Sequence, residues 1–231
     1  MRKRHRRDLH AVARQVLAHA MKVTKLEHAA LILDTAGKTL VIDPGSLTTP
    51  ITEPGNAVGI VITHEHADHW TPEQLNRVLG KNPGIPIFAP QGVADAAQGF
   101  DITVVEDGST VEVGPFSLQF FGTTHAEIHP TLPRCDNVGV LVGGSFFYPG
   151  DAFTVPPVKV TTLAVPSAAP WLKLGESIDY ITAVAPTHVF PVHDMHLSVA
   201  GKGLHNGRLE AATTAIGAEF TVLEPGQSLD V

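Results

Sequence analysis

The sequence contains a single cysteine, Cys135, among its 231 residues. One thiol cannot form an intramolecular disulfide or a cysteine-rich zinc site, so histidine and carboxylate side chains would have to hold any metal. The sequence also lacks a continuous apolar run of roughly 18 residues, the length that spans a bilayer, and an apolar secretory signal. We therefore expect a cytoplasmic protein with no membrane segment.

Charge is sparse and unevenly distributed. Charged residues make up 17% of the chain, and the net charge is −7. Residues 1–20 hold six cations and one acid, a net +5, and the total of −7 less this +5 leaves −12 on residues 21–231. An acidic body argues against a general binder of phosphate backbones. We expect residues 1–20 to be a flexible basic N-terminal extension and residues 21–231 to form one domain with a sizeable core.

Apolar periodicity predicts alternating strands and helices. Residues 26–42 form a hairpin pattern turning at 35–38, and the apolar run over 57–63 is typical of a strand buried on both faces. Thr71 and Pro72 predict a helix over 72–79, as N-cap and first helical residue. Further strands are expected at 85–89, 102–105, 109–113, 116–121, 138–142, 145–148, 163–165, 188–192 and 220–223, and helices at 92–98, 172–184 and 204–216. This order favours an α/β fold with sheets covered by helices.

Histidine is abundant, with 13 residues, and it is concentrated after the buried strand at 57–63. His64, His66, Asp68 and His69 lie within six consecutive positions, 64–69, between that strand and the next helix. Side chains that follow strand ends gather at the active sites of α/β folds. Two imidazoles two positions apart can converge on one metal ion, while the carboxylate and the third imidazole reach a neighbouring ion. We interpret the segment as a metal-binding loop.

This loop resembles the His-x-His-x-Asp-His signature of the metallo-β-lactamase superfamily, and later residues match the family in order. His125 follows the strand at 116–121, Asp151 follows Pro149-Gly150, and His193 follows the strand at 188–192. Asp43 matches the family's opening aspartate, which is mainly structural. The resemblance covers residue 26 to the C-terminus. It implies a metallo-β-lactamase-fold domain, a four-layer αββα sandwich of two mixed sheets with outer helices.

The resemblance also implies two divalent metal ions. One would be bound by His64, His66 and His125, the other by Asp68, His69 and His193, with Asp151 bridging them. Zinc is the expected metal, although such ligands also accept manganese or iron. Two ions lower the pKa of a shared water, so hydrolysis needs no protein nucleophile, and Asp68 could pass a proton to the leaving group. His66 stands where the redox flavodiiron branch carries glutamate, which favours hydrolysis.

The local sequence around two other histidines resembles that of the L-ascorbate-6-phosphate lactonase-like branch of the family. His28 lies in Glu27-His28-Ala29, and His129 precedes Pro130. In that branch such residues lie near the metals, so the resemblance implies that His28 and His129 are candidate catalytic groups beside Asp68. An edge-of-core histidine and a plain loop residue explain the two positions equally well.

Four residues near these motifs have less defined roles. We expect Glu65 to hydrogen-bond the loop rather than act as a base, because Asp68 breaks the His-Glu-x-x-His spacing. Trp70 and Trp171 could line a pocket, but packing explains buried tryptophans as well. Cys135 has no positioned base in the sequence, so it receives no role.

Three functions are compatible with these motifs. A hydrolase that cleaves an ester, lactone or phosphodiester of a small metabolite uses every ligand match. An RNase Z-like nucleic-acid phosphodiesterase is supported only by the basic residues 1–20, and the acidic remainder opposes it. A non-catalytic metal-binding or partner-binding protein would be favoured by a missing ligand, and none is missing. We expect a hydrolase with a small-molecule substrate and no nucleic-acid partner, acting alone or as a homo-oligomer.

Overall fold

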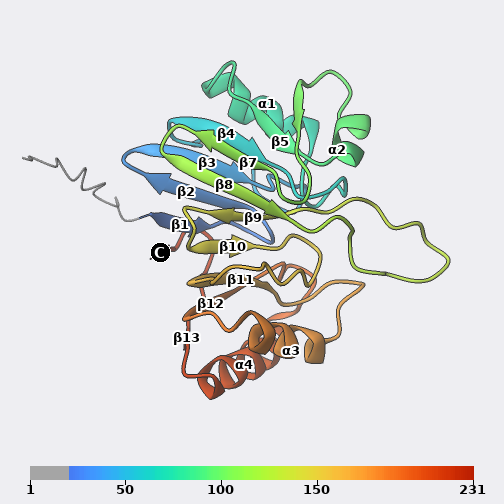
Figure 1. Ribbon diagram of the computed structural model, residues 1–231, viewed down its shortest axis with the longest axis vertical. Helices are drawn as coiled ribbons and strands as arrows, with labels where there is room; N and C mark the ends of the chain where they lie inside the picture. Colours follow the sequence, from blue (N-terminus) through green and yellow to red (C-terminus); the bar gives the residue numbers. More distant parts are fainter. Residues whose placement is uncertain (1–20) are drawn as a thin grey trace, which may run out of the picture.

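Two seven-stranded sheets lie face to face, with helices on both outer sides (Figure 1). The computed structural model describes residues 21–231, so the predicted basic extension of residues 1–20 lies outside the described residues. This arrangement confirms the expected αββα sandwich of two mixed sheets. None of the helices within residues 21–231 combines the length and apolarity needed to cross a membrane.

The first sheet has the order β14-β1-β2-β3-β4-β5-β6, and it is antiparallel from β14 to β3 and parallel from β3 to β6. Its strands are β1 (Lys22–Lys25), β2 (Leu31–Thr35), β3 (Lys38–Ile42), β4 (Ala57–Val61), β5 (Ile87–Ala89), β6 (Ile102–Val104) and β14 (Ser228–Asp230). The predicted hairpin is present as β2 and β3. Its two turn residues, Ala36 and Gly37, have φ values of 54° and 73°, as a tight hairpin turn requires.

The second sheet has the order β13-β12-β11-β10-β9-β8-β7, parallel from β13 to β10 and antiparallel from β10 to β7. Its strands are β7 (Thr110–Val113), β8 (Phe116–Phe121), β9 (Gly139–Val142), β10 (Phe146–Tyr148), β11 (Thr162–Pro166), β12 (His188–Val192) and β13 (Glu219–Phe220). Each sheet therefore has a parallel half in which several strands end at the same rim.

Within the described part of the chain, residues 21–231, four helices cover the outer faces: α1 (Pro72–Lys81), α2 (Gln91–Ala96), α3 (Leu174–Val184) and α4 (Val199–Ala215). In Figure 1, α1 and α2 lie beside β5, and α3 and α4 lie on the opposite side of the molecule, next to the second sheet. The predicted cap of α1 is confirmed, because the Thr71 side chain accepts the N–H of Gln74. The prediction for α4 started too late, since Ser198 caps a helix whose first turn contains Gly201.

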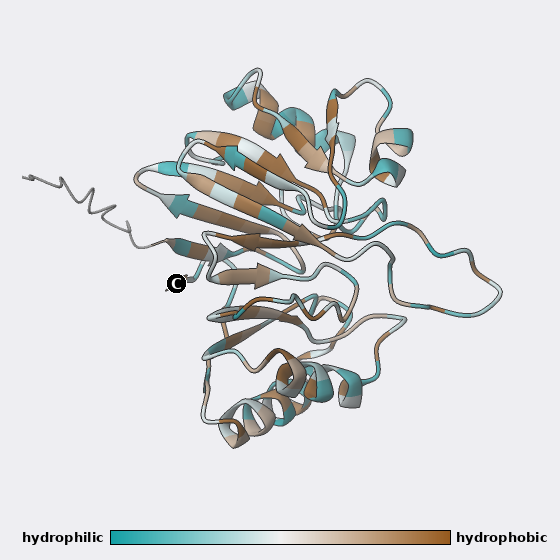
Figure 2. Cartoon of the chain, viewed as in Figure 1, coloured by the Kyte–Doolittle hydropathy of each residue, from teal (hydrophilic) through white to brown (hydrophobic). Residues whose placement is uncertain are grey.

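Three apolar cores separate the four layers. The central core lies between the sheets, a second lies between the first sheet and helices α1 and α2, and a third lies between the second sheet and helices α3 and α4. Strand β3 shows how one strand contributes to two cores. Leu40 and Ile42 belong to the central core, whereas Val41 between them belongs to the outer one. Figure 2 shows brown, hydrophobic stretches along strands of both sheets and mixed colours on the helices.

The prediction of a final strand over 220–223 is wrong in its extent. β13 ends at Phe220, and after one more hydrogen bond, from the N–H of Thr221 to the carbonyl of Val189 in β12, the chain crosses to the other sheet. There Ser228–Asp230 forms β14, which pairs with β1. This short strand carries one apolar residue, Leu229, so its sequence has no strand pattern, and its conformation depends on the pairing with β1.

Candidate metal centre

The loop after β4 carries the histidine motif in a tightly held conformation. The backbone N–H of His69 donates to the carbonyl of His66 at 3.0 Å, which closes a turn inside the motif. The segment after β3 presses on the loop from one side: a Cβ atom at Gly45 would lie 1.7 Å from the carbonyl oxygen of Asp68. Only glycine permits this approach, so the sequence Asp-Pro-Gly at 43–45 positions the loop through its backbone.

The first predicted ligand set converges. His64 and His66 come from the loop after β4, and His125 comes from the segment after β8, in the other sheet. Their ring centroids lie 4.8 Å apart for His64 and His66, 4.7 Å for His66 and His125, and 4.9 Å for His64 and His125. Each ring offers a nitrogen, and these atoms lie within 4.8 Å of one another. The structure thus assembles three imidazoles in the spacing of a metal site.

The second predicted set converges beside the first. His193 follows β12, and its Nε2 lies 3.4 Å from Oδ2 of Asp68. His69 Nε2 lies 3.8 Å from the same oxygen. Together with His28, these three side chains form a second group that could hold a metal ion.

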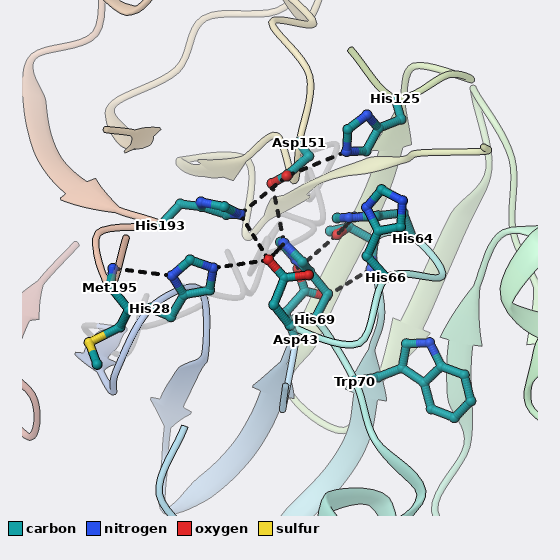
Figure 3. A network of polar contacts seen from close by, with 12 residues as sticks. His28, Asp43, His64, His66, His69, Trp70, His125, Asp151, His193 and Met195 are labelled. Atoms are coloured by element: carbon teal, nitrogen blue, oxygen red, sulfur yellow. Dashed lines mark hydrogen bonds and ion pairs between the residues drawn. The ribbon is translucent and has the colours of Figure 1, made fainter. Parts of the chain in front are cut away.

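Asp151 lies between the two groups (Figure 3). Its Oδ2 atom is 3.4 Å from Nε2 of His125 and 3.2 Å from Nε2 of His193. Its Oδ1 atom is 3.3 Å from Nε2 of His69. Burial alone would raise the pKa of Asp151, but His193 and His69 hold it well below its ordinary value. An ionised carboxylate in this position can interact with both groups at once.

Several of these atoms are buried without a hydrogen-bond partner. They are His64 Nε2, His69 Nε2, His125 Nε2, His193 Nε2 and Asp151 Oδ1. An unsatisfied buried polar group costs about 1–3 kcal/mol, so such a concentration calls for a ligand. Four imidazole nitrogens and a carboxylate oxygen are the donors that zinc and similar divalent ions prefer. The residues present therefore fit a metal centre.

The opposite ring nitrogens are engaged with the protein. Nδ1 of His125 donates to the carbonyl of Ala126 at 2.5 Å, and Nδ1 of His193 donates to the carbonyl of Ala168 at 2.5 Å. His64 Nδ1 lies 3.0 Å from the Thr63 hydroxyl. A proton held on Nδ1 leaves the Nε2 lone pair free for a metal.

Asp43 anchors the loop through four hydrogen bonds. Its Oδ1 accepts the backbone N–H of Thr63 at 2.8 Å, and its Oδ2 accepts the Thr63 hydroxyl at 2.7 Å. The same Oδ2 lies 2.6 Å from Nδ1 of His69 and accepts the Tyr148 hydroxyl at 2.9 Å. Burial and the Asp43 charge raise the pKa of Tyr148 well above its ordinary value, so it remains a donor. Sequence reasoning missed Tyr148, whose only signal was its place before Pro149-Gly150-Asp151.

His28, the fourth member of the second group, is hydrogen-bonded to Asp68. Its Nδ1 accepts the backbone N–H of Met195 at 3.3 Å, so its proton is on Nε2, which donates to Oδ2 of Asp68 at 3.1 Å (Figure 3). Burial lowers the pKa of His28 to about 4, which keeps the ring neutral. Its two nitrogens are therefore both occupied by protein groups.

Three other residues that were considered from the sequence, His129, Glu65 and Cys135, are not among the converging ligands. His129 is exposed in the loop between β8 and β9, and its Nδ1 lies 2.8 Å from the Thr131 hydroxyl, so the structure does not bring it to the cluster. Glu65 has an exposed side chain, and its carbonyl accepts the indole N–H of Trp70 at 3.0 Å. Cys135 Sγ lies 3.8 Å from Nε2 of His66, and burial raises the pKa of the Cys135 thiol to about 11.

A pocket of about 360 Å³ opens over the cluster. Besides ligand residues, its lining includes Leu47, Ile128, Pro170, Trp171 and His196. A neighbouring pocket of about 460 Å³ shares Ile128, Pro170 and Trp171 with it. Trp171 lines the pocket, which is one of the two roles considered for it from the sequence, whereas Trp70 is not in the lining. His196 carries no local motif, and only the fold reveals its position.

Comparisons with known proteins agree with this geometry. Residues 22–193 match the family described as the Beta-lactamase superfamily domain. Protein Rv0786c of Mycobacterium tuberculosis is 34% identical over 209 residues, covering 88% of this chain and 96% of that protein. A UPF0173 metal-dependent hydrolase of Aeropyrum pernix is 36% identical over 81 residues, 33% of this chain and 32% of that protein. The structure of Igni18, a metallo hydrolase from Ignicoccus hospitalis, has a TM-score of 0.71 at 17% identity and covers 92% of this chain and 98% of Igni18.

Proposed function

The chain belongs to the beta-lactamase superfamily, and we propose that it is a metal-dependent hydrolase that cleaves an ester, lactone or phosphodiester bond of a small metabolite. The observation that carries this proposal is the convergence of unpartnered His nitrogens and an Asp151 oxygen on one buried place at the floor of a pocket. The names of the relatives from Aeropyrum pernix and Ignicoccus hospitalis, a metal-dependent hydrolase and a metallo hydrolase, support the same activity.

We assign the ligands of two divalent ions as the motif implies. The first would be held by His64, His66 and His125, the second by Asp68, His69 and His193, and Asp151 would contact both. Zinc suits these donors best, and manganese or iron also fits them. Ions held here would activate a water molecule and polarise the bond under attack.

Asp68 is our candidate for proton transfer to the leaving group. Its side chain is 24% exposed and lines the pocket. Oδ2 accepts the His28 proton at 3.1 Å, whereas Oδ1 has no hydrogen bond to any residue within 21–231. Oδ1 can therefore accept a proton and deliver it to a leaving group in the pocket. His28 acts through Asp68, because its N–H fixes the carboxylate orientation. The exposed His129 is left out of this machinery.

The pocket suits a small substrate. About 360 Å³ above the cluster, extended by the neighbouring pocket, matches the size of common small-molecule sites. Leu47, Ile128 and Pro170 give its wall an apolar part. The position of His28 beside Asp68 supports placing the chain near the L-ascorbate-6-phosphate lactonase-like branch, and lactones are thus the first substrates to test.

The decisive experiment measures metal content per chain by elemental mass spectrometry, on protein purified without chelator or added metal. About two equivalents support the dinuclear centre and identify the ion to use with lactone, ester and phosphodiester substrates. Hydrolysis should disappear with a chelator and return when that ion is restored. A chain that binds no metal, even after addition, would overturn the proposed function.

A further inference from the structure

We infer that Trp171 is a positioning residue of the metal centre, because its indole N–H holds the shared carboxylate of Asp151 between the two groups of ligands. The inference rests on the proposed metal centre and adds a residue that the ligand motif does not contain. In the sequence Trp171 stands twenty residues after Asp151, in the segment between β11 and α3.

The contact between the two side chains is short and buried. Nε1 of Trp171 donates to Oδ2 of Asp151 at 2.7 Å, and the two residues are 8% and 3% exposed. An indole N–H is a donor only, so Trp171 cannot serve as a ligand itself. It occupies one lone pair of Oδ2 and leaves Oδ1, which has no partner, directed at His69. The hydrogen bond therefore determines how the carboxylate is turned.

The indole ring is itself held in place. It packs edge-on against Phe153, with ring centroids 5.1 Å apart, and against the ligand His125, with centroids 6.0 Å apart. Phe153 in turn packs on Tyr180 of α3, and the Tyr180 hydroxyl donates to the carbonyl of Thr154 at 2.6 Å. These contacts restrict the ring, so the direction of its N–H is restricted as well.

The backbone around Trp171 orients a second ligand. The carbonyl of Ala168 accepts a hydrogen bond from Nδ1 of His193. The N–H and the hydroxyl of Ser167 both donate to the carbonyl of Val192, the residue before His193. One segment, residues 167–171, thus reaches both the bridging carboxylate and a histidine of the second group. A disturbance of this segment should affect metal binding more than the stability of the sheets.

The chain offers a matched control in its other tryptophan. Trp70 is also 8% exposed, and its N–H also makes a hydrogen bond, at 3.0 Å. Its acceptor is the carbonyl of Glu65, however, and its ring lies apart from the ligand cluster (Figure 3). Trp70→Phe and Trp171→Phe therefore each replace an indole by a phenyl ring and remove one N–H hydrogen bond. Only Trp171→Phe removes a donor to a ligand side chain.

The test compares zinc binding by wild type, Trp171→Phe and Trp70→Phe, using zinc alone in competition with a chromophoric chelator. Loss of a group that orients a ligand typically weakens metal binding about 10- to 100-fold, and we expect this for Trp171→Phe. Trp70→Phe removes a hydrogen bond to the backbone of the ligand loop but no donor to a ligand side chain, so it should weaken zinc binding less than Trp171→Phe does. The cobalt-substituted forms should show a changed visible spectrum for Trp171→Phe alone. The midpoint temperature of thermal unfolding, measured in chelator, should fall by a similar amount in both variants.

Equal zinc affinities and cobalt spectra in the two variants would overturn the inference and leave the proposed function standing. A wild-type chain that binds none of zinc, manganese and iron would overturn both. Fluorescence provides a test if Trp171→Phe fails to fold. The chain has 2 tryptophans, so in Trp70→Phe all indole emission comes from Trp171. Zinc should change this emission, and zinc that binds without any change would contradict the contact.

Discussion

Replacing Asp43 by asparagine should damage both the stability of the metal-free protein and its affinity for metal. The carboxylate accepts four hydrogen bonds in a fully buried place, from the backbone and hydroxyl of Thr63, from His69 and from Tyr148. Asparagine has the same shape, but one of its two terminal atoms becomes an NH₂ group, which cannot accept. With NH₂ at the Oδ2 position three donors lose their acceptor, and with NH₂ at the Oδ1 position one does.

The less damaging orientation sets the smallest effect. It removes one hydrogen bond to a charged group and leaves the Thr63 N–H buried and unpaired, a loss of at least about 2–3 kcal/mol. This is a large part of a typical unfolding free energy of about 5–15 kcal/mol. His69 also loses the anion that holds its Nδ1 proton, so metal affinity should fall about 10- to 100-fold.

Urea unfolding in chelator measures the first effect, and chelator competition with zinc measures the second. Asp34→Asn is the control, since the Asp34 carboxylate accepts, from residues 21–231, only the N–H of Gly37 in the hairpin turn, at 3.3 Å. Its change should stay within about 0.5 kcal/mol. If Asp43→Asn matched Asp34→Asn in both assays, the buried carboxylate would not anchor the loop, and the reasoning would be refuted.

Four further predictions concern the centre and its surroundings. His66→Ala should lose one ion and reduce hydrolysis by orders of magnitude while unfolding in chelator changes little; full metal content at full rate would remove His66 from the site. Asp151→Asn should weaken the binding of both ions, because it removes the negative charge between them. An unchanged metal stoichiometry and affinity would count against a bridging role. His28→Ala should lower kcat with two ions still bound, since it frees Asp68 to rotate, whereas loss of an ion would make His28 a ligand. Burial raises the pKa of Cys135 to about 11, so its thiol stays protonated below that pH, and iodoacetamide should modify it slowly at pH 8 and faster as the pH approaches 11; rapid modification at pH 8 would contradict this burial.

The sequence predicted those parts of the site whose residues form a short motif or lie next to a recognisable strand. The ligand motif lies in one loop after β4, His193 directly follows β12, and Asp151 follows β10 after Pro149 and Gly150, so their spacing and order are visible without a structure. Trp171 and Tyr148 were different, because their roles depend on a hydrogen bond to a distant carboxylate and not on neighbouring residues. The same reason explains why β14 was missed, as its partner β1 lies at the opposite end of the described chain.

The division of the ligands between the two sheets bears on the order of events during synthesis. His64, His66, Asp68 and His69 follow β4 in the first sheet, whereas His125, Asp151 and His193 follow strands of the second. A ribosome must therefore translate β12 before the last of these side chains exists, and the two halves must dock before either ion has its full coordination. Loading of the proposed ions would thus be a late step, and a bound ion would join the halves at one rim, so that withdrawing it should loosen their docking before it unfolds either sheet.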